Sequence, residues 1–299
     1  MTSTTSAFRS GFIAMVGAPN VGKSTLLNRL LGEKISITSR KPQTTRNRIL
    51  GVVHRERSQM IFVDTPGIHR SGSQLNVRIV DAALAAIGDA DLLLMIADAC
   101  SPDPDSERLL IENLRGQNRT VILALNKIDR IDKPSLLSQI AGWSRRFTFE
   151  AIVPISARMG TQVDVLLSAM EKGLPLGPPL FPEDAVTDAP MRFIAAEIVR
   201  EKVFRYTGDE IPYATAVTVD EFNAAGDRAP VRISATIHVE RDSQKGMVIG
   251  KKGGKLRQIG AAAREDLEKM LEKQVVLNLF VRVQKNWSRD GRALRKFGY

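Results

Sequence analysis

The stretch GAPNVGKS, Gly17–Ser24, decides the fold of the first part of the chain. An apolar run, residues 12–16, precedes it and a helical pattern, residues 25–31, follows it. The sequence therefore predicts a strand, a glycine-rich turn and a helix, which is the context in which GxxxxGK[ST] binds phosphate. Glycine lets the backbone N–H groups point inward and join the positive end of the helix. A plain glycine turn does not require the adjoining lysine and serine.

Each part of this loop has an expected role in binding a nucleotide. The Lys23 ammonium is expected on the β- and γ-phosphates, and the Ser24 hydroxyl is expected to bind Mg²⁺. Lys23 is therefore also a candidate catalytic residue. The predicted nucleotide-contacting residues of this segment are Gly17, Ala18, Pro19, Asn20, Val21, Gly22, Lys23, Ser24 and Thr25.

Two further segments have the features of switch loops. Residues 34–49 are polar and basic without a helical period, and they contain the hydroxyl pair Thr44 and Thr45. Such a loop can close over a γ-phosphate, with a threonine completing the Mg²⁺ shell. Thr45 is the first choice for this ligand and for a catalytic role, and Thr44 is the alternative. The sequence DTPG follows a second predicted strand. There Asp64 is expected to hold Mg²⁺ through water, and the Gly67 N–H to contact a γ-phosphate; Thr65 and Pro66 complete the motif.

The sequence NKID, residues 126–129, predicts which base is bound. The Asp129 carboxylate can accept both the ring N–H and the exocyclic amine of guanine, and adenine lacks that pair of donors. Lys127 is expected to pack along the base and Asn126 to brace the loop. A third motif, SAR, follows the last predicted strand, where a backbone N–H is expected to contact the guanine carbonyl; its residues are Ser156, Ala157 and Arg158. These motifs favour a GTPase and make an ATPase the least favoured reading.

The predicted strands alternate with helices up to residue 172, and every motif lies at the end of a strand. This pattern predicts an α/β domain, residues 1–172, with a mostly parallel sheet, helices on both faces and ligands at the carboxyl ends of the strands. Residues 173–190 contain five prolines and predict a semi-rigid linker. Residues 191–299 are then a second domain.

Charge is distributed unevenly along the 299 residues. Residues 231–299 hold 16 Lys/Arg and 7 Asp/Glu, whereas residues 1–230 hold 27 and 26. The excess indicates a polyanionic partner, either nucleic acid or an anionic membrane surface. The single cysteine, Cys100, excludes an intrachain disulfide and favours a reducing compartment, and no apolar run is long enough to span a membrane.

The second domain contains a candidate RNA clamp. An amphipathic helix is predicted over residues 191–206, followed by two strands, a helical segment and the sequence VIGKKGGK. The GxxG from Gly250 to Gly253 lets the main chain approach phosphates, and its lysines supply charge. Element order α-β-β-α-α-β around such a loop matches the type II KH arrangement, an α+β fold. The predicted RNA-binding residues are Gly250, Lys251, Lys252, Gly253 and Lys255. The basic tail, residues 285–299, is expected either to add contacts to RNA or to pack on the domain.

These motifs together resemble those of the Era family of GTPases, bacterial ribosome-assembly factors. The resemblance covers nearly the whole chain and rests on GAPNVGKS, QTTRNR, DTPG, NKID, SAR, FPEDAVTD and VIGKKGGK. It implies hydrolysis of GTP to GDP coupled to binding of 16S ribosomal RNA near its 3′ end during assembly of the 30S subunit. It also implies a cytoplasmic protein with some peripheral membrane association. We expect a monomer.

One position departs from the common GTPase pattern. Many GTPases have a water-orienting glutamine directly after DxxG, and this chain has Ile68. Slow intrinsic turnover is therefore expected, with charge stabilisation by the loop, Lys23 and Mg²⁺. Asn20 is a candidate ligand for a K⁺ ion beside the phosphates, as in related GTPases with this loop. Two alternatives stay open: an RNA scaffold that uses GTP only as a structural ligand, and a membrane-surface GTPase whose basic domain binds lipid.

Overall fold

The structure is a computed structural model, and it describes residues 8–38, 48–64, 88–208, 211–224, 226 and 229–297. The described residues form two compact units. The first comprises residues 8–36, 48–64 and 88–188. The second comprises the described residues from Ala189 onward, together with Ile37 and Thr38.

The first unit is built on a six-stranded sheet with the order β2-β3-β1-β4-β5-β6. All neighbouring strands are parallel except β2, which pairs antiparallel with β3. The mostly parallel sheet predicted from the sequence is confirmed. The strands are β1 (Arg9–Val16), β2 (Ile49–Arg55), β3 (Ser58–Asp64), β4 (Leu92–Asp98), β5 (Thr120–Asn126) and β6 (Ala151–Pro154).

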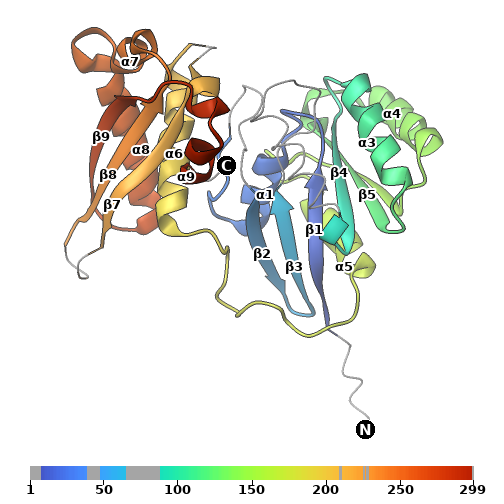
Figure 1. Cartoon of the computed structure of the whole chain (residues 1–299). Helices are drawn as coiled ribbons and strands as arrows, with labels where there is room; N and C mark the ends of the chain where they lie inside the picture. The colour runs from blue at the N-terminus through green and yellow to red at the C-terminus, as the bar shows by residue number, and fades with distance from the viewer. Residues whose placement is uncertain are drawn as a thin grey trace. The chain divides into compact units, whose positions relative to one another are not determined.

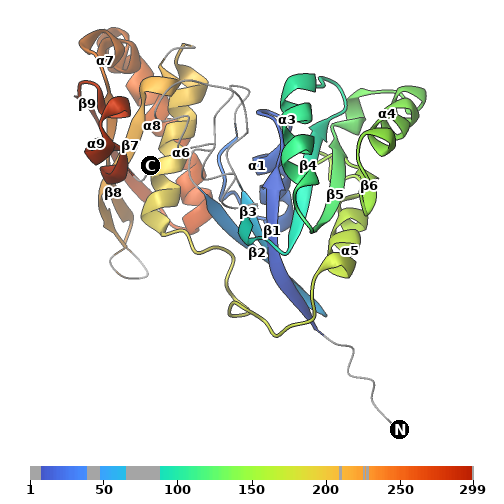
Figure 2. The ribbon, with the colours of Figure 1, turned by 45° about the vertical axis from the view of Figure 1, so that its right-hand side comes forward.

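Helices cover both faces of this sheet (Figures 1 and 2). They are α1 (Lys23–Leu31), α3 (Pro104–Arg115), α4 (Lys133–Arg146) and α5 (Val163–Gly173). The starts of α3 and α4 follow from the sequence, since Asp103 and Asp132 cap them and a proline stands in each first turn. The helix predicted near residues 75–87 lies outside the described residues.

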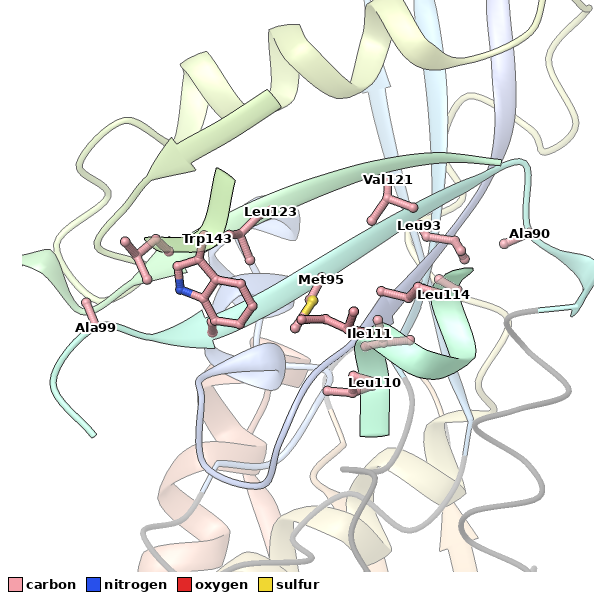
Figure 3. Close-up of a cluster of buried hydrophobic side chains, with 14 residues drawn as sticks. Ala90, Leu93, Met95, Ala99, Leu110, Ile111, Leu114, Val121, Leu123 and Trp143 are labelled. Carbon is pink, nitrogen blue, oxygen red and sulfur yellow. The ribbon is translucent and has the colours of Figure 1, made fainter. Parts of the chain in front are cut away.

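The hydrophobic core between the sheet and the α3–α4 side explains why the strands are continuous apolar runs. Side chains of β1, β4 and β5 meet those of α3 and α4, and Trp143 of α4 closes one end of the cluster (Figure 3). Parallel strands with both faces covered carry few polar residues. The polar residues at their carboxyl ends, such as Asp64 and Asn126, are therefore conspicuous in the sequence.

The second unit has the order α6 (Met191–Tyr206), β7 (Ala216–Asn223), β8 (Val231–Val239), α7 (Asp242–Ile249), α8 (Gly254–Leu271), β9 (Val275–Val283), as the sequence predicted. Its three strands are ordered β7-β8-β9, with β7 antiparallel and β9 parallel to β8. Helices α6 and α8 pack on the sheet (Figure 1). The predicted alternation in β8 is confirmed, because Val231, Ile233, Ala235, Ile237 and Val239 are all buried.

The prediction that α6 is amphipathic is wrong. Every residue from Ile194 to Phe204 is buried, charged ones included. The charges are tolerated because they are paired. Arg200 pairs with Glu197, and Lys202 donates to Glu201 at 3.2 Å and also to Asp266 of α8. Buried ions require such partners, so the sequence pattern was misread as one exposed face.

The tail packs on the second unit. Trp287 is fully buried and its indole N–H donates to the Ala214 carbonyl at 3.1 Å. Phe297, directly after helix α9 (Gly291–Lys296), lies with its ring centroid 4.5 Å from that of His238. Of the two uses expected for the tail aromatics, these two residues therefore contribute packing.

The proline-rich segment is bonded to the first unit. The Val52 N–H donates to the Val186 carbonyl at 2.8 Å, and the Thr187 hydroxyl donates to the Leu50 carbonyl at 2.6 Å. Gln59 also accepts the N–H groups of Leu180 and Phe181 at 2.6 and 2.9 Å. The segment therefore runs beside β2 and β3 as a strap.

Candidate nucleotide site and RNA interface

The loop Gly17–Ser24 connects β1 to α1 and requires its glycines. A Cβ on Gly17 would lie 2.4 Å from the Ile96 carbonyl oxygen, and one on Gly22 would lie 2.4 Å from the Asn126 side-chain nitrogen. Gly22 also has φ of 105°, a left-handed conformation that side chains disfavour. Packing against neighbouring strand ends therefore sets the loop's shape, and the first turn of α1, with Thr25, follows directly.

Lys23 lies inside the loop it is expected to serve. Its side chain is buried, and its ammonium donates to the carbonyls of Gly17 and Ala18 at 2.9 and 3.0 Å. Burial lowers the pKa of Lys23 to about 8, with the charge of Asp64 acting in the opposite direction. A nucleotide phosphate at this place would supply the negative charge that the buried ammonium lacks.

The predicted magnesium residues Ser24 and Asp64 are brought together. The Ser24 hydroxyl donates to Asp64 Oδ2 at 2.9 Å, although 40 residues separate them in the chain. A hydroxyl and a carboxylate at the mouth of an anion-binding loop are the hard oxygen donors that suit Mg²⁺. The third predicted ligand, Thr45, lies outside the described residues, as do Thr65, Pro66 and Gly67.

Asn126 braces the base end of the site, as expected. Its side-chain nitrogen donates to the Val21 carbonyl at 2.7 Å, and its side-chain oxygen accepts the Ala157 N–H at 2.9 Å. One side chain therefore joins the phosphate loop, the end of β5 and the loop after β6. The Ala157 N–H, a candidate donor to the guanine carbonyl, is engaged with Asn126 in this structure.

Lys127 and Asp129 are also held by neighbours. Lys127 donates to the Asn20 carbonyl at 2.8 Å and forms an ion pair with Asp98, so its ammonium links the base loop to the phosphate loop. The Ser156 hydroxyl donates to Asp129 Oδ1 at 2.6 Å. Ser156 thereby orients the carboxylate predicted to read guanine, a role the sequence did not assign to it.

Four residues outside the predicted motifs complete this arrangement: Asp98, Arg29, Asn28 and Ser36. Asp98 ends β4 directly beside Asn126 in the sheet register, a position that the strand pattern could have indicated. Arg29 of α1 donates to the carbonyls of Ala157 and Arg158, 128 and 129 residues away. No sequence signal indicates contacts over such separations.

Both glycines of the GxxG loop in the second unit have a positive φ. Gly250 and Gly253 have φ of 70° and 74°, and a Cβ on Gly250 would lie 2.7 Å from Lys255 Cβ. Lys251 and Lys252 are exposed, and Lys252 itself has a left-handed φ of 51°. The N-terminus of α8 follows the loop directly. The N–H groups of Gly250 and Gly253 donate to the carbonyls of Gly246 and Gly250 at 2.8 and 3.1 Å, so the two exposed lysine side chains supply the charge that faces solvent here.

A groove adjoins this loop between α8 and β9, with a volume of about 580 Å³. Its walls are largely apolar, and two arginines of α8 stand in them. The described residues that line it include Gly253, Leu256, Arg257, Gly260, Arg264, Val276 and Leu279. Largely apolar walls that carry two guanidinium groups suit an unstacked base beside its phosphate.

Comparisons with known proteins match both parts of the chain. A family described as 50S ribosome-binding GTPase matches residues 12–127, and a family described as KH domain matches residues 210–288. GTPase Era of Geobacter metallireducens is 54% identical, covering 98% of each chain. GTPase Era of Haemophilus ducreyi is 47% identical, covering 97% of this chain and 95% of that protein.

The chain belongs to the GTPase Era family. A crystal structure of an Aquifex aeolicus Era variant bound to GDP and AlF4⁻ matches with a TM-score of 0.93 and 42% identity, covering 98% of this chain and 99% of that one. An Era structure in complex with MgGDPNP and nucleotides 1506–1542 of 16S ribosomal RNA matches with a TM-score of 0.91, 41% identity and the same coverage. The predicted fold, a P-loop GTPase domain followed by a KH domain, is confirmed.

Proposed function

We propose that the chain is a GTP-hydrolysing switch that binds small-subunit ribosomal RNA and acts in assembly of the 30S subunit. The observation that carries the nucleotide part is the position of Asp129, fixed by Ser156 on a loop that Asn126 and Lys127 join to the phosphate loop. The base and the phosphates of one nucleotide would then be bound by loops that hydrogen bonds join to each other. The relatives' names and the bound nucleotides in their structures support this assignment.

The chain's own residues account for the chemistry in a simple way. Lys23 moves from the carbonyls of Gly17 and Ala18 to the β- and γ-phosphates, and backbone N–H groups of the loop bind the phosphate oxygens. Mg²⁺, held by Ser24 and Asp64 with Thr45 proposed as a further ligand, supplies neutralisation of the phosphate charge when bound. Ile68 has no group to orient water, so slow intrinsic turnover is expected.

Multiple-turnover GTP hydrolysis by the full chain tests this proposal. We expect phosphate release above background, lost in Lys23→Ala and retained in Lys133→Ala, whose lysine is exposed on α4. Binding of GTP without turnover would instead favour the alternative of an RNA scaffold with GTP as a structural ligand.

The RNA part rests on the Gly250–Gly253 loop and its groove. We propose that it clamps the backbone of 16S ribosomal RNA near the 3′ end, the region present in the related complex. Crosslinking of the full chain to cellular RNA, with and without a non-hydrolysable GTP analogue, tests the target and its control by nucleotide. Crosslinks confined to other RNAs would contradict the assignment.

Two finer proposals concern ions and membranes. We propose that Asn20, which has a left-handed φ of 63° in the loop, helps to bind K⁺ beside the phosphates. Equal hydrolysis rates in K⁺ and Na⁺ buffers would contradict this. Among the described residues no helix is long and apolar enough to cross a bilayer. Peripheral membrane association and the monomeric state stay predictions, checked by vesicle sedimentation and by light scattering.

A further inference from the structure

Ser36, near the start of the first predicted switch segment, contacts the Asp64 carboxylate, although no sequence motif assigns it a role. Its hydroxyl donates to Asp64 Oδ2 at 2.8 Å, the same oxygen that accepts the Ser24 hydroxyl at 2.9 Å. Both Ser36 and Asp64 are fully buried. Two hydroxyl donors therefore converge on one oxygen of a buried carboxylate, and hydrogen bonds to such a charged acceptor are strong.

Asn28 fixes Ser36 in this position. The Asn28 side-chain oxygen accepts the N–H groups of Ile35 and Ser36 at 3.0 and 2.8 Å, and its side-chain nitrogen donates to the Ser36 carbonyl at 2.6 Å. Asn28 lies on α1, which begins in the phosphate loop. The same helix therefore carries Ser24 and the side chain that places Ser36, so both donors to Asp64 share one rigid support.

We propose that Ser36 is a positioning residue for the magnesium site: it orients the Asp64 carboxylate so that Ser24 and Asp64 hold the ion and, through it, the bound guanine nucleotide. This inference rests on the proposed function, since it takes Ser24 and Asp64 as the Mg²⁺ residues. Ser36 itself donates a hydrogen bond to Asp64 and is not a ligand of the Mg²⁺ ion.

An orienting role and a merely structural role for Ser36 predict different dependences of nucleotide release on Mg²⁺. If Ser36 only helps the protein to fold, its loss changes nucleotide release equally with and without Mg²⁺. If it orients Asp64, its loss weakens the ion and speeds release only where Mg²⁺ holds the nucleotide. Removing a hydrogen bond to a buried charged group commonly changes an equilibrium about tenfold or more.

The experiment uses the full chain loaded with a fluorescent GDP analogue. Its release is followed by stopped flow over a Mg²⁺ titration and in excess EDTA. For Ser36→Ala we expect about a tenfold rise in the Mg²⁺ concentration that gives half-maximal retention, with the release rate in EDTA equal to that of the parent. Asn28→Ala, which frees the Ser36 backbone but keeps its hydroxyl, should shift the titration in the same direction.

Ser58→Ala is the matched control. Ser58 is fully buried at the start of β3, the strand that ends in Asp64, and its hydroxyl has no hydrogen-bond partner among the described residues. Its removal should leave the titration unchanged. Circular dichroism and RNA binding report whether each variant is folded.

Two results would overturn the inference. One is a Ser36→Ala titration that coincides with the parent's, and the other is faster release by the same factor in EDTA and in Mg²⁺. If the parent itself retains the nucleotide equally well with and without Mg²⁺, the assignment of Ser24 and Asp64 as Mg²⁺ residues fails first.

Discussion

The guanine end of the first unit and the GxxG loop of the second are proposed to bind different parts of a nucleotide, and they are built differently. At the guanine end, the side chains of Asn126, Lys127 and Asp129 all form hydrogen bonds within the protein. In the GxxG loop, Lys251 and Lys252 are exposed, and backbone conformation sets the loop's shape. Reading one base requires fixed donors and acceptors, whereas gripping a phosphate backbone requires close approach and charge.

The largest effect is expected where the hydrogen-bond acceptor that is predicted to read guanine is replaced by a group that also donates. In Asp129→Asn an amide replaces the carboxylate that accepts from guanine, so GTP affinity should fall about a thousandfold or more. Xanthosine triphosphate, whose added carbonyl accepts from that amide, should bind instead. Competition titration against labelled GDP measures both. Asp105→Asn, an exposed change on α3, is the control; unchanged GTP affinity in Asp129→Asn would contradict the base assignment.

Charge reversal should affect the GxxG loop strongly but without a change of sequence preference. For Lys251→Glu with Lys252→Glu, RNA affinity should fall about a hundredfold at moderate salt, because two phosphate contacts are lost. Each lost contact should also reduce the salt slope by about one. Filter binding at several salt concentrations measures both quantities. Lys133→Glu with Lys172→Glu, exposed positions of the first unit, reverses equal charge elsewhere. Equal losses in the two doubles would mean that net charge alone is responsible.

The phosphate loop should show a pH dependence that the base end lacks. The free-state pKa of Lys23 is about 8, and bound phosphates raise it, so binding requires proton uptake above pH 8. Nucleotide affinity should therefore fall about tenfold between pH 7 and pH 9, as the protonated fraction of Lys23 falls. Titration with labelled GDP across this range checks it. An affinity that is constant, or that rises with pH, would contradict the buried position of Lys23.

The smallest effects are expected for residues that only support the base loop. Asp98→Ala removes the anion that holds the Lys127 ammonium and should speed GDP release about five- to tenfold. Asp98→Asn keeps an acceptor at the same place and should speed it less. Stopped-flow release measures the two variants. If Asn is no better than Ala, the ion pair's charge rather than the acceptor is what matters.

The family, the GTPase and KH folds and the order of elements along the chain were predictable because they rest on short motifs. GAPNVGKS, NKID and VIGKKGGK each specify backbone conformations within a few residues. The contacts of Arg29 and Ser36 were not predictable, since they join residues 28 to 129 positions apart. The error at α6 has the same origin: Lys202 is buried because Asp266, on another helix, pairs with it. The predicted roles of Thr45 and Gly67 stay predictions.

The strap beside β2 has a consequence for the solubility of the first unit. Strand β2 ends the order of the six-stranded sheet, and such an edge offers unpaired N–H and C=O groups to other chains. Val186 and Thr187 occupy part of that edge through Val52 and Leu50. A fragment cut at Gly173 would lose this cover and gain a site for strand addition. A fragment that continues to Asp188 would keep it, so the segment between the domains also protects the first one from aggregation.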